Sequence, residues 1–522
     1  MKFARSSGIL LHPTSFPGRY GIGDLGDAAY RFVDFLAETG QSLWQLMPLG
    51  PTGFGDSPYA SFSAFAGNPM LISPDLLAVE NYLNEEDLAQ IPDFSADRIE
   101  FGPVIEYKKL LLARSYERFQ ATATAQEKEN FVTFRQTNSS WLDDYALFMA
   151  LKEHHGGASW NSWEKELATH QPQALAKWRE QFAAEVSYQS YLQYQFYRQW
   201  SAIKQYANQR NIKIIGDIPI FVAYDSADTW SHPDLFHLDK DGNPLIVAGV
   251  PPDYFSATGQ RWGNPLYKWE ALAAQNYSWW ISRFRRTFEL VDIVRIDHFR
   301  GFEAYWAVPA TEETAVKGQW LKGPGAALFT VVHTELGEPP IIAEDLGVIT
   351  PEVEALRDQF GFPGMKILQF GFGDNPTNVY LPHNFERNTV VYTGSHDNDT
   401  TRGWFEKAPE GERAMAQLYL ARDGSDISWD LIRLAFSAVS DIAVVPLQDI
   451  LSLGSEARMN TPGQAAGNWG WRYWPDALDE TIKGRLTDLT RLYARNPQEV
   501  ATIKLAQAES LHEAQASGEI PD

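Results

Sequence analysis

Three acidic side chains that follow separate apolar segments are the residues of this chain best suited to catalysis. They are Asp297, Glu344 and Asp397, and each comes at the end of a predicted β-strand. A carboxyl group can attack as a nucleophile, exchange a proton as a general acid or base, or stabilise a developing cation. Asp217 follows a fourth apolar segment in the same way. We interpret these four acids as a candidate catalytic rim, because packing alone does not explain them.

The environments of the acids indicate different roles. Side chains alternate along a strand, so Arg295 and Asp297 share one face, where the guanidinium supplies a partner and favours the ionised carboxylate that a nucleophile needs. A structural ion pair that caps the strand is the alternative interpretation. Glu344 follows a strongly apolar run with no cation beside it, which suits a proton donor. Asp397, next to His396, suits a group that stabilises positive charge. Two carboxyl groups that flank a glycosidic bond are the usual means of cleaving it.

Eight short apolar segments must position these acids. They are rich in Ile, Val and Leu, and they read as buried parallel strands separated by helical patterns: 8–12, 42–47, 212–218, 291–297, 340–345, 365–370, 389–394 and 441–445. Eight alternating units predict a (β/α)₈ TIM barrel of the α/β class, whose active site lies where the strands end. An open doubly wound sheet is the competing fold.

The spacing of the strands predicts insertions in a single catalytic unit over 1–522. Residues 51–205 are too many for one crossover, so we expect an inserted, mainly helical subdomain between the second and third strands. A smaller insertion is expected over 223–290, with an active-site loop at 249–265. The Asp-Gly pair at 241–242 predicts a hairpin turn there, and residues 506–522 are expected to form a C-terminal helix and tail.

Composition excludes several classes of function. The chain has 44 Lys and Arg against 67 Asp and Glu, a net charge of −23, so we expect neither nucleic acid nor an anionic membrane as a partner. It has no cysteine, which rules out disulfides and thiolate chemistry. Its N-terminus does not read as a signal peptide, and we expect a cytoplasmic protein. For its oligomeric state we expect a monomer or a weak dimer.

Two motifs resemble a cofactor site and a metal site, but the residues around each motif do not fit such a site. The glycines at 21, 23 and 26 match a dinucleotide fingerprint, but the preceding loop contains Pro13 and Pro17 and the next strand ends without an acid. The segment 239–243 begins like a calcium loop but lacks the distal Glu. We predict no cofactor and no required metal.

Aromatic residues make up 13% of the chain, with 18 Trp, 22 Tyr and 30 Phe. Most are expected to pack in the core. Some could bind sugar, because the apolar face of a pyranose ring stacks on a flat aromatic ring. Composition alone does not identify the ligand.

Ten segments along the chain match one known family. They are 7–13, 55–59, 216–222, 249–256, 259–265, 295–301, 343–347, 394–398, 458–460 and 467–469. Through them nearly the whole chain resembles the amylomaltase, or disproportionating-enzyme, family, which comprises the 4-α-glucanotransferases of glycoside hydrolase family 77, relatives of the α-amylases. The resemblance is weak over about residues 75–205.

The resemblance implies a retaining double displacement on α-1,4-glucans and maltooligosaccharides, which serve as donor and acceptor. It implies that Asp297 is the nucleophile, Glu344 the acid/base and Asp397 the transition-state stabiliser. The residues that it implies around the sugars are Tyr59, Asp217, Tyr254, Phe255, Gln260, Trp262, Asn264, Arg295, His298, His396 and Asn460.

Two other functions stay open at this point. A hydrolase of α-1,4-glucans would use the same three acids and differ only in letting water attack the intermediate. A cover of aromatic residues over the site, from Tyr254, Phe255 and Trp262, would favour transfer by excluding water. A non-catalytic carbohydrate-binding protein would need the aromatic residues but not the acids.

Overall fold

Eight parallel strands form the centre of the computed structural model, which describes residues 3–252, 256–373 and 375–516. Each strand overlaps a range predicted from the sequence. The strands are β1 (Ser6–Leu10), β2 (Leu43–Gln45), β3 (Lys213–Pro219), β6 (Ile293–Asp297), β9 (Ile341–Ala343), β10 (Gly364–Ile367), β11 (Thr389–Tyr392) and β12 (Ile442–Pro446).

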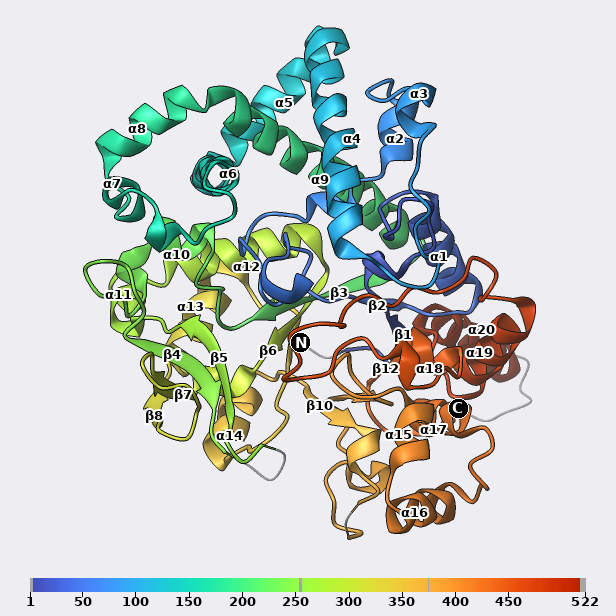
Figure 1. The fold of residues 1–522 in the computed structure, drawn as a ribbon. Helices are drawn as coiled ribbons and strands as arrows, with labels where there is room; N and C mark the ends of the chain where they lie inside the picture. The colour runs from blue at the N-terminus through green and yellow to red at the C-terminus, as the bar shows by residue number, and fades with distance from the viewer. Residues whose placement is uncertain (1–2, 253–255, 374, 517–522) are drawn as a thin grey trace.

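The order of these strands closes the sheet on itself. They are hydrogen-bonded in the order β10–β11–β12–β1–β2–β3–β6–β9. The N–H of Ala343 in β9 donates to the carbonyl oxygen of Pro363, just before β10, at 2.9 Å. The two outer strands therefore meet, and the fold is the predicted (β/α)₈ barrel rather than the open sheet (Figure 1).

Burial explains why the barrel strands were visible in the sequence. Every residue of β1, β2, β9, β11 and β12 is buried. Strands of a parallel barrel are covered on both faces, so they read as continuous apolar runs rather than alternating ones.

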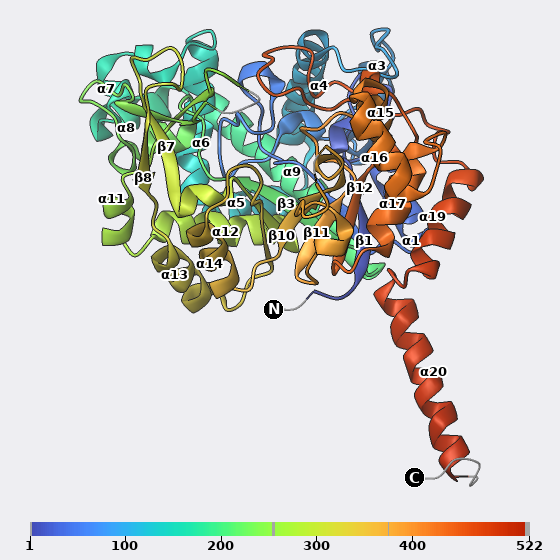
Figure 2. The same ribbon diagram turned by 90° about the horizontal axis from the view of Figure 1, so that it is seen from below.

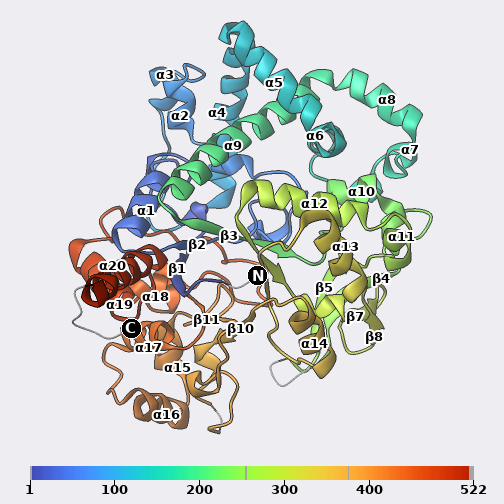
Figure 3. The same ribbon diagram turned by 180° about the vertical axis from the view of Figure 1, so that it is seen from behind.

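Helices surround the barrel strands (Figures 1 and 3). One of them, α1 (Asp27–Glu38), ends just before Gly40, whose φ of +71° is a backbone conformation that glycine adopts without strain. Between β10 and β11 the described residues form two 3₁₀ turns, η7 (Leu368–Phe370) and η8 (Pro382–Asn384), in place of a helix. The other helices along the barrel are α12 (Ser278–Leu290), α13 (Ala326–Leu336), α14 (Pro351–Gln359), α15 (Thr401–Lys407), α16 (Glu410–Leu420), α17 (Ile427–Ser437), α18 (Leu447–Ile450) and α19 (Glu480–Leu492).

The chain between β2 and β3 is helical and forms an arch above the barrel (Figure 1). Its helices are α2 (Pro74–Val79), α3 (Glu85–Leu88), α4 (Phe101–Thr122), α5 (Ala125–Thr137), α6 (Ser139–His154), α7 (Lys165–Ala168), α8 (Pro172–Gln181) and α9 (Ala183–Gln209). The long helix α9 returns the chain to the barrel, and the indole N–H of Trp200 donates to the carbonyl oxygen of Leu290 at 2.8 Å.

A second sheet, antiparallel and four-stranded, stands beside the barrel. Its order is β5–β4–β7–β8, and two short helices, α10 (Ala227–Ser231) and α11 (Trp269–Ala274), flank it in the chain. The turn predicted at 241–242 is present near this sheet, where the N–H of Asp239 donates to Asn243 O at 2.8 Å. The strands are β4 (Ile246–Val250), β5 (Gln260–Pro265), β7 (Ala304–Pro309) and β8 (Gln319–Lys322), of which the last two follow β6 in the chain.

The two ends of the barrel segment are tied together by a buried arginine. The Arg495 guanidinium donates to the carbonyl oxygens of Ser6, Phe436 and Ser440. Beyond it, α20 (Pro497–Ala516) projects away from the body of the molecule (Figure 2). No helix in the described part of the chain is long and apolar enough to span a membrane.

Candidate active site

The register of two neighbouring strands brings the first charged groups together. In the pairing of β3 with β6, Asp217 lies opposite Arg295, and Pro219 lies opposite Asp297. The Arg295 Nη1 is 2.5 Å from Asp217 Oδ2 and 3.0 Å from Asp297 Oδ1. The ion pair expected from strand alternation is therefore present, and one guanidinium serves two carboxylates at the carboxyl end of the barrel.

Asp217 is the most deeply buried of the acids, with only 2% of its side chain exposed. Its Oδ2 also accepts a hydrogen bond from the Tyr59 hydroxyl at 2.7 Å, whereas its Oδ1 has no partner among the described residues. Burial raises the pKa of Asp217 to about 6, and the positive charge of Arg295 opposes that rise. An unpaired, buried carboxylate oxygen is a site where a hydroxyl group would be accepted.

Glu344, immediately after β9, is held by two main-chain donors. Its Oε2 accepts from the N–H of His298 at 2.7 Å and its Oε1 from the N–H of Leu346 at 2.9 Å. Burial, reinforced by the negative charge of Asp297, raises the pKa of Glu344 to about 8, although the two hydrogen bonds and Arg295 act in the opposite direction. Glu344 therefore retains a proton at neutral pH.

His298 has a strained backbone and an unpaired side chain. Its φ of +53° is left-handed, which is uncommon for a residue with a Cβ and tends to occur at functional sites. Its Nε2 is buried without a partner among the described residues, and the ring meets Trp262 edge-on at 4.8 Å. Burial lowers the pKa of His298 to about 4, so the ring is neutral at physiological pH.

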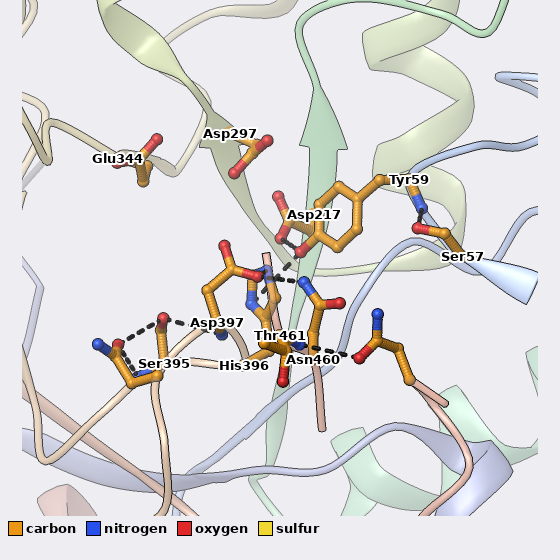
Figure 4. Close-up of polar contacts among 12 residues, drawn as sticks. Ser57, Tyr59, Asp217, Asp297, Glu344, Ser395, His396, Asp397, Asn460 and Thr461 are labelled. Carbon is orange, nitrogen blue, oxygen red and sulfur yellow. Dashed lines mark hydrogen bonds and ion pairs between the residues drawn. The ribbon is translucent and has the colours of Figure 1, made fainter. Parts of the chain in front are cut away.

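Asp397 is anchored by a segment from much later in the chain. The Asn460 side-chain amide donates to Asp397 Oδ1 at 2.6 Å, and the Arg458 Nη2 donates to the Asp397 carbonyl oxygen at 2.6 Å. The His396 Nε2 lies 3.4 Å from the same Oδ1. Asn460, predicted as a sugar contact, thus binds one of the three candidate catalytic acids. Asp297, Asp397, Asp217 and Tyr59 face a common space (Figure 4).

Trp469 is a site residue to which the sequence assigned no role. Its ring packs against both Tyr59 and His396, each at 5.9 Å between centroids, and those two rings stack on each other at 5.0 Å. Its φ is +62°, an outlier for so bulky a side chain. The segment 467–469 was part of the family resemblance, and this motif was the available signal.

A groove of about 1310 Å³ passes over these residues. Nine of the predicted site residues line it, while Asp217, Arg295 and Glu344 do not. Trp262, in β5, is 39% exposed, and its indole N–H donates to the Gln260 side chain at 3.1 Å. The predicted contacts Tyr254 and Phe255 lie outside the described residues. The nine predicted site residues that line the groove are Tyr59, Gln260, Trp262, Asn264, Asp297, His298, His396, Asp397 and Asn460.

Known proteins resemble this chain over most of its length. The sequence profile of the 4-alpha-glucanotransferases matches residues 11–477. A 4-alpha-glucanotransferase of Synechocystis sp. is 54% identical over 94% of this chain and 98% of its own length, and one of Thermus thermophilus is 51% identical over 93% and 98%. The amylomaltase of Streptococcus agalactiae, solved in complex with acarbose, superimposes with a TM-score of 0.91 at 41% identity and covers 94% of this chain and 99% of its own. The chain therefore belongs to the 4-alpha-glucanotransferase family.

Proposed function

We propose that the protein moves a segment of an α-1,4-glucan to the 4-hydroxyl group of another glucan, or of glucose, by a retaining double displacement. Maltooligosaccharides and longer α-1,4-glucans serve as both donor and acceptor. The observation that carries this proposal is the contrast between two nearby carboxyl groups. Asp297 is paired with a guanidinium, whereas Glu344 has a pKa raised to about 8.

In this proposal Asp297 attacks the anomeric carbon of the donor. The carboxylate must be ionised to do so, and Arg295, 3.0 Å away, favours that form. The bond from the anomeric carbon to the leaving oxygen breaks as the bond to Asp297 forms, which gives a covalent glycosyl-enzyme. Asp297 also lines the groove, so the sugar can reach it.

Glu344 supplies the proton for the leaving oxygen and removes one from the incoming hydroxyl group. A carboxyl group has about four lone-pair sites, and the N–H groups of His298 and Leu346 occupy two of them. The others remain for the transferred proton. Glu344 does not line the groove, and we expect its side chain to turn towards the sugar during the reaction.

Asp397 stabilises the positive charge that develops on the sugar ring. The Asn460 amide at 2.6 Å fixes its carboxylate, and the stacked rings of Tyr59, His396 and Trp469 form a rigid wall beside it. A charge that is already oriented stabilises a transition state without the cost of reorganisation. Asp217, through its unpaired Oδ1, is proposed to accept a hydroxyl group of the same sugar.

Transfer and hydrolysis differ only in what attacks the glycosyl-enzyme. Trp262 and Gln260, side by side on β5, line the groove near His298 and are proposed to bind the acceptor sugar in place of water. Incubation with maltotriose separates the two outcomes. Longer chains plus glucose, with a constant number of reducing ends, are expected; a rise in reducing ends without longer products would refute transfer.

The role of Asp297 is tested by substituting it. Asp297→Asn should abolish turnover and leave glucan binding, followed by calorimetry, largely intact. Asp143→Asn, an exposed residue of α6, is the matched control and should keep full activity. Near-normal turnover of the Asp297 variant would show that another group attacks.

A further inference from the structure

A short loop at the carboxyl end of β11 carries the candidate acid Asp397. Residues 394–400 form this loop and connect β11 to α15. Within it, Asn398 Oδ1 accepts from the N–H and from the hydroxyl group of Ser395, both at 2.9 Å. These bonds fold the loop on itself but do not attach it to the barrel. The position of Asp397 therefore depends on the contacts that hold the loop from outside.

One buried carboxyl group holds both ends of the loop. Thr393 stands immediately before the loop, and Thr401 stands immediately after it. Asp449 Oδ2 accepts from the hydroxyl group of Thr393 at 2.6 Å and from that of Thr401 at 2.7 Å, while Asp449 Oδ1 accepts from the N–H of Thr401 at 2.7 Å. Asp449 is 1% exposed, and both threonines are fully buried. Water cannot replace these hydrogen bonds, so their loss would free both ends of the loop.

The element that carries Asp449 is fixed in the core. Helix α18 follows β12 without a break, and every residue of both is buried. The neighbouring residue of α18, Gln448, donates from its amide to the Ala457 carbonyl oxygen at 3.3 Å. Ala457 is followed by Arg458, which donates to the Asp397 carbonyl oxygen. Two adjacent residues of α18 thus hold the loop of Asp397 and the segment that contacts this loop.

The residue type of Asp449 fits this task. Burial raises the pKa of Asp449, the negative charge of Asp399 adds to the rise, and the hydrogen bonds from the two threonines oppose it. A buried carboxyl group is therefore costly at this position. It also offers about four lone-pair sites on two oxygens, and the threonines occupy three of them. Few side chains accept hydrogen bonds in so many directions, and joining the two ends of a loop requires this.

We propose that Asp449 is a positioning residue for glucan transfer, which holds Asp397 where positive charge develops on the sugar ring. This rests on the proposed function, because the role of Asp397 is part of it. Asp449 is buried and does not line the groove, so it acts through the loop rather than by touching a sugar. A fixed charge stabilises the transition state best when its place is set before the reaction begins, and the three hydrogen bonds set it.

Asp449→Ala removes all three hydrogen bonds and should lower kcat on maltotriose about tenfold. A displacement of 1 Å can cost roughly a hundredfold in rate, but a second contact limits the movement, because Asp399 Oδ2 still accepts from the Ser455 hydroxyl group at 2.7 Å. KM should change by less than about twofold, since no sugar contact is lost. The rates are compared at a temperature well below the melting transition of each variant, where circular dichroism shows that the protein is folded.

Two further variants separate positioning from a loss of stability. Asp449→Asn keeps an oxygen for the Thr401 N–H, and its NH₂ group can donate to the two hydroxyl groups, so kcat should stay within about threefold of the unaltered protein. The matched control is Asp292→Ala. Asp292 lies just before β6, at the opposite end of the barrel, and its Oδ2 accepts from the Ile214 N–H at 2.8 Å and from the Asn208 amide at 2.9 Å. This control should lower the melting temperature but leave kcat and KM unchanged.

The outcomes distinguish the role of Asp449 from the proposed function. Lack of transfer from maltotriose by the unaltered protein would refute the proposed function. Normal transfer, with a kcat for Asp449→Ala that matches Asp292→Ala or a KM that rises while kcat stays constant, would refute only the role of Asp449. A kcat for Asp449→Asn as low as that of Asp449→Ala would also refute it, because the hydrogen bonds would then not be what matters. If Asp449→Ala does not fold, Thr401→Val decides: it removes one hydroxyl donor to Asp449 and should lower kcat about threefold at constant KM, and an unchanged kcat overturns the proposal.

Discussion

The hydrogen bond from Asn460 to Asp397 allows a test of how the site is organised. If Asn460 acts by orienting Asp397, Asn460→Ala removes an interaction that matters in the transition state and lowers kcat with little change in KM. If it acts by binding sugar, KM rises instead. The 2.6 Å hydrogen bond from Asn460 and the contact of Arg458 with the main chain of Asp397 favour the orienting role.

The structure also sets the size of the effect. A hydrogen bond to a charged group contributes about 1.5–3 kcal/mol. The Asp397 side chain is 49% exposed, so water replaces part of the lost bond and the lower value of about 1.5 kcal/mol applies. We therefore expect kcat to fall about tenfold.

Initial rates of glucose release from maltotriose over a range of concentrations give both constants. Asn130→Ala is the control, because Asn130 is an exposed residue of α5 whose side chain accepts a hydrogen bond from Gln126. A rise in KM at constant kcat would contradict the orienting role and return Asn460 to the sugar contacts. Unchanged constants would show that the bond does not matter for catalysis.

Three further predictions concern charge and stability. Because Glu344 donates a proton and its pKa is about 8, kcat/KM should fall as pH rises through about 8. A pH–rate profile on maltotriose measures this fall. If kcat/KM has already fallen fully at neutral pH, the assignment of Glu344 as the proton donor is wrong. Arg295→Met leaves Asp217 buried without its cation and should lower the free energy of unfolding in urea by about 3–5 kcal/mol, and a second change, Asp217→Asn, should recover much of the loss. Deleting 501–522 should change the free energy of unfolding in urea by less than about 0.5 kcal/mol. The reason is that the side chains of 501–510 are exposed, whereas Arg495, before the deleted residues, is buried and hydrogen-bonded to the barrel. A larger loss would show that α20 stabilises the barrel.

The barrel could be predicted from the sequence because burial on both faces leaves a local signal. The runs that became β3, β6 and β11 are rich in Ile and Val. Asp217 within β3, Asp297 at the end of β6 and Asp397 after β11 stand out against them. The alternation of side chains was sufficient to predict the pair of Arg295 and Asp297, since both lie on one strand.

Contacts between residues that lie far apart in the sequence could not be predicted in this way. Nothing near Asn460 indicates that it meets Asp397, because the two lie on separate loops of the barrel mouth. The antiparallel sheet was missed because β5 is largely exposed and has no apolar run, although its neighbours β4 and β7 are mostly buried.

The sharing of one guanidinium by two carboxylates has a practical consequence. Asp217 and Asp297 share the charge of Arg295, and Asp397 is a further acid beside them, so the site has an excess of negative potential. Small protonated amines that present hydroxyl groups, a class that includes common buffers and amino sugars, combine a cation for this potential with donors for its oxygens. We expect them to inhibit competitively, so rates should be measured in buffers free of them.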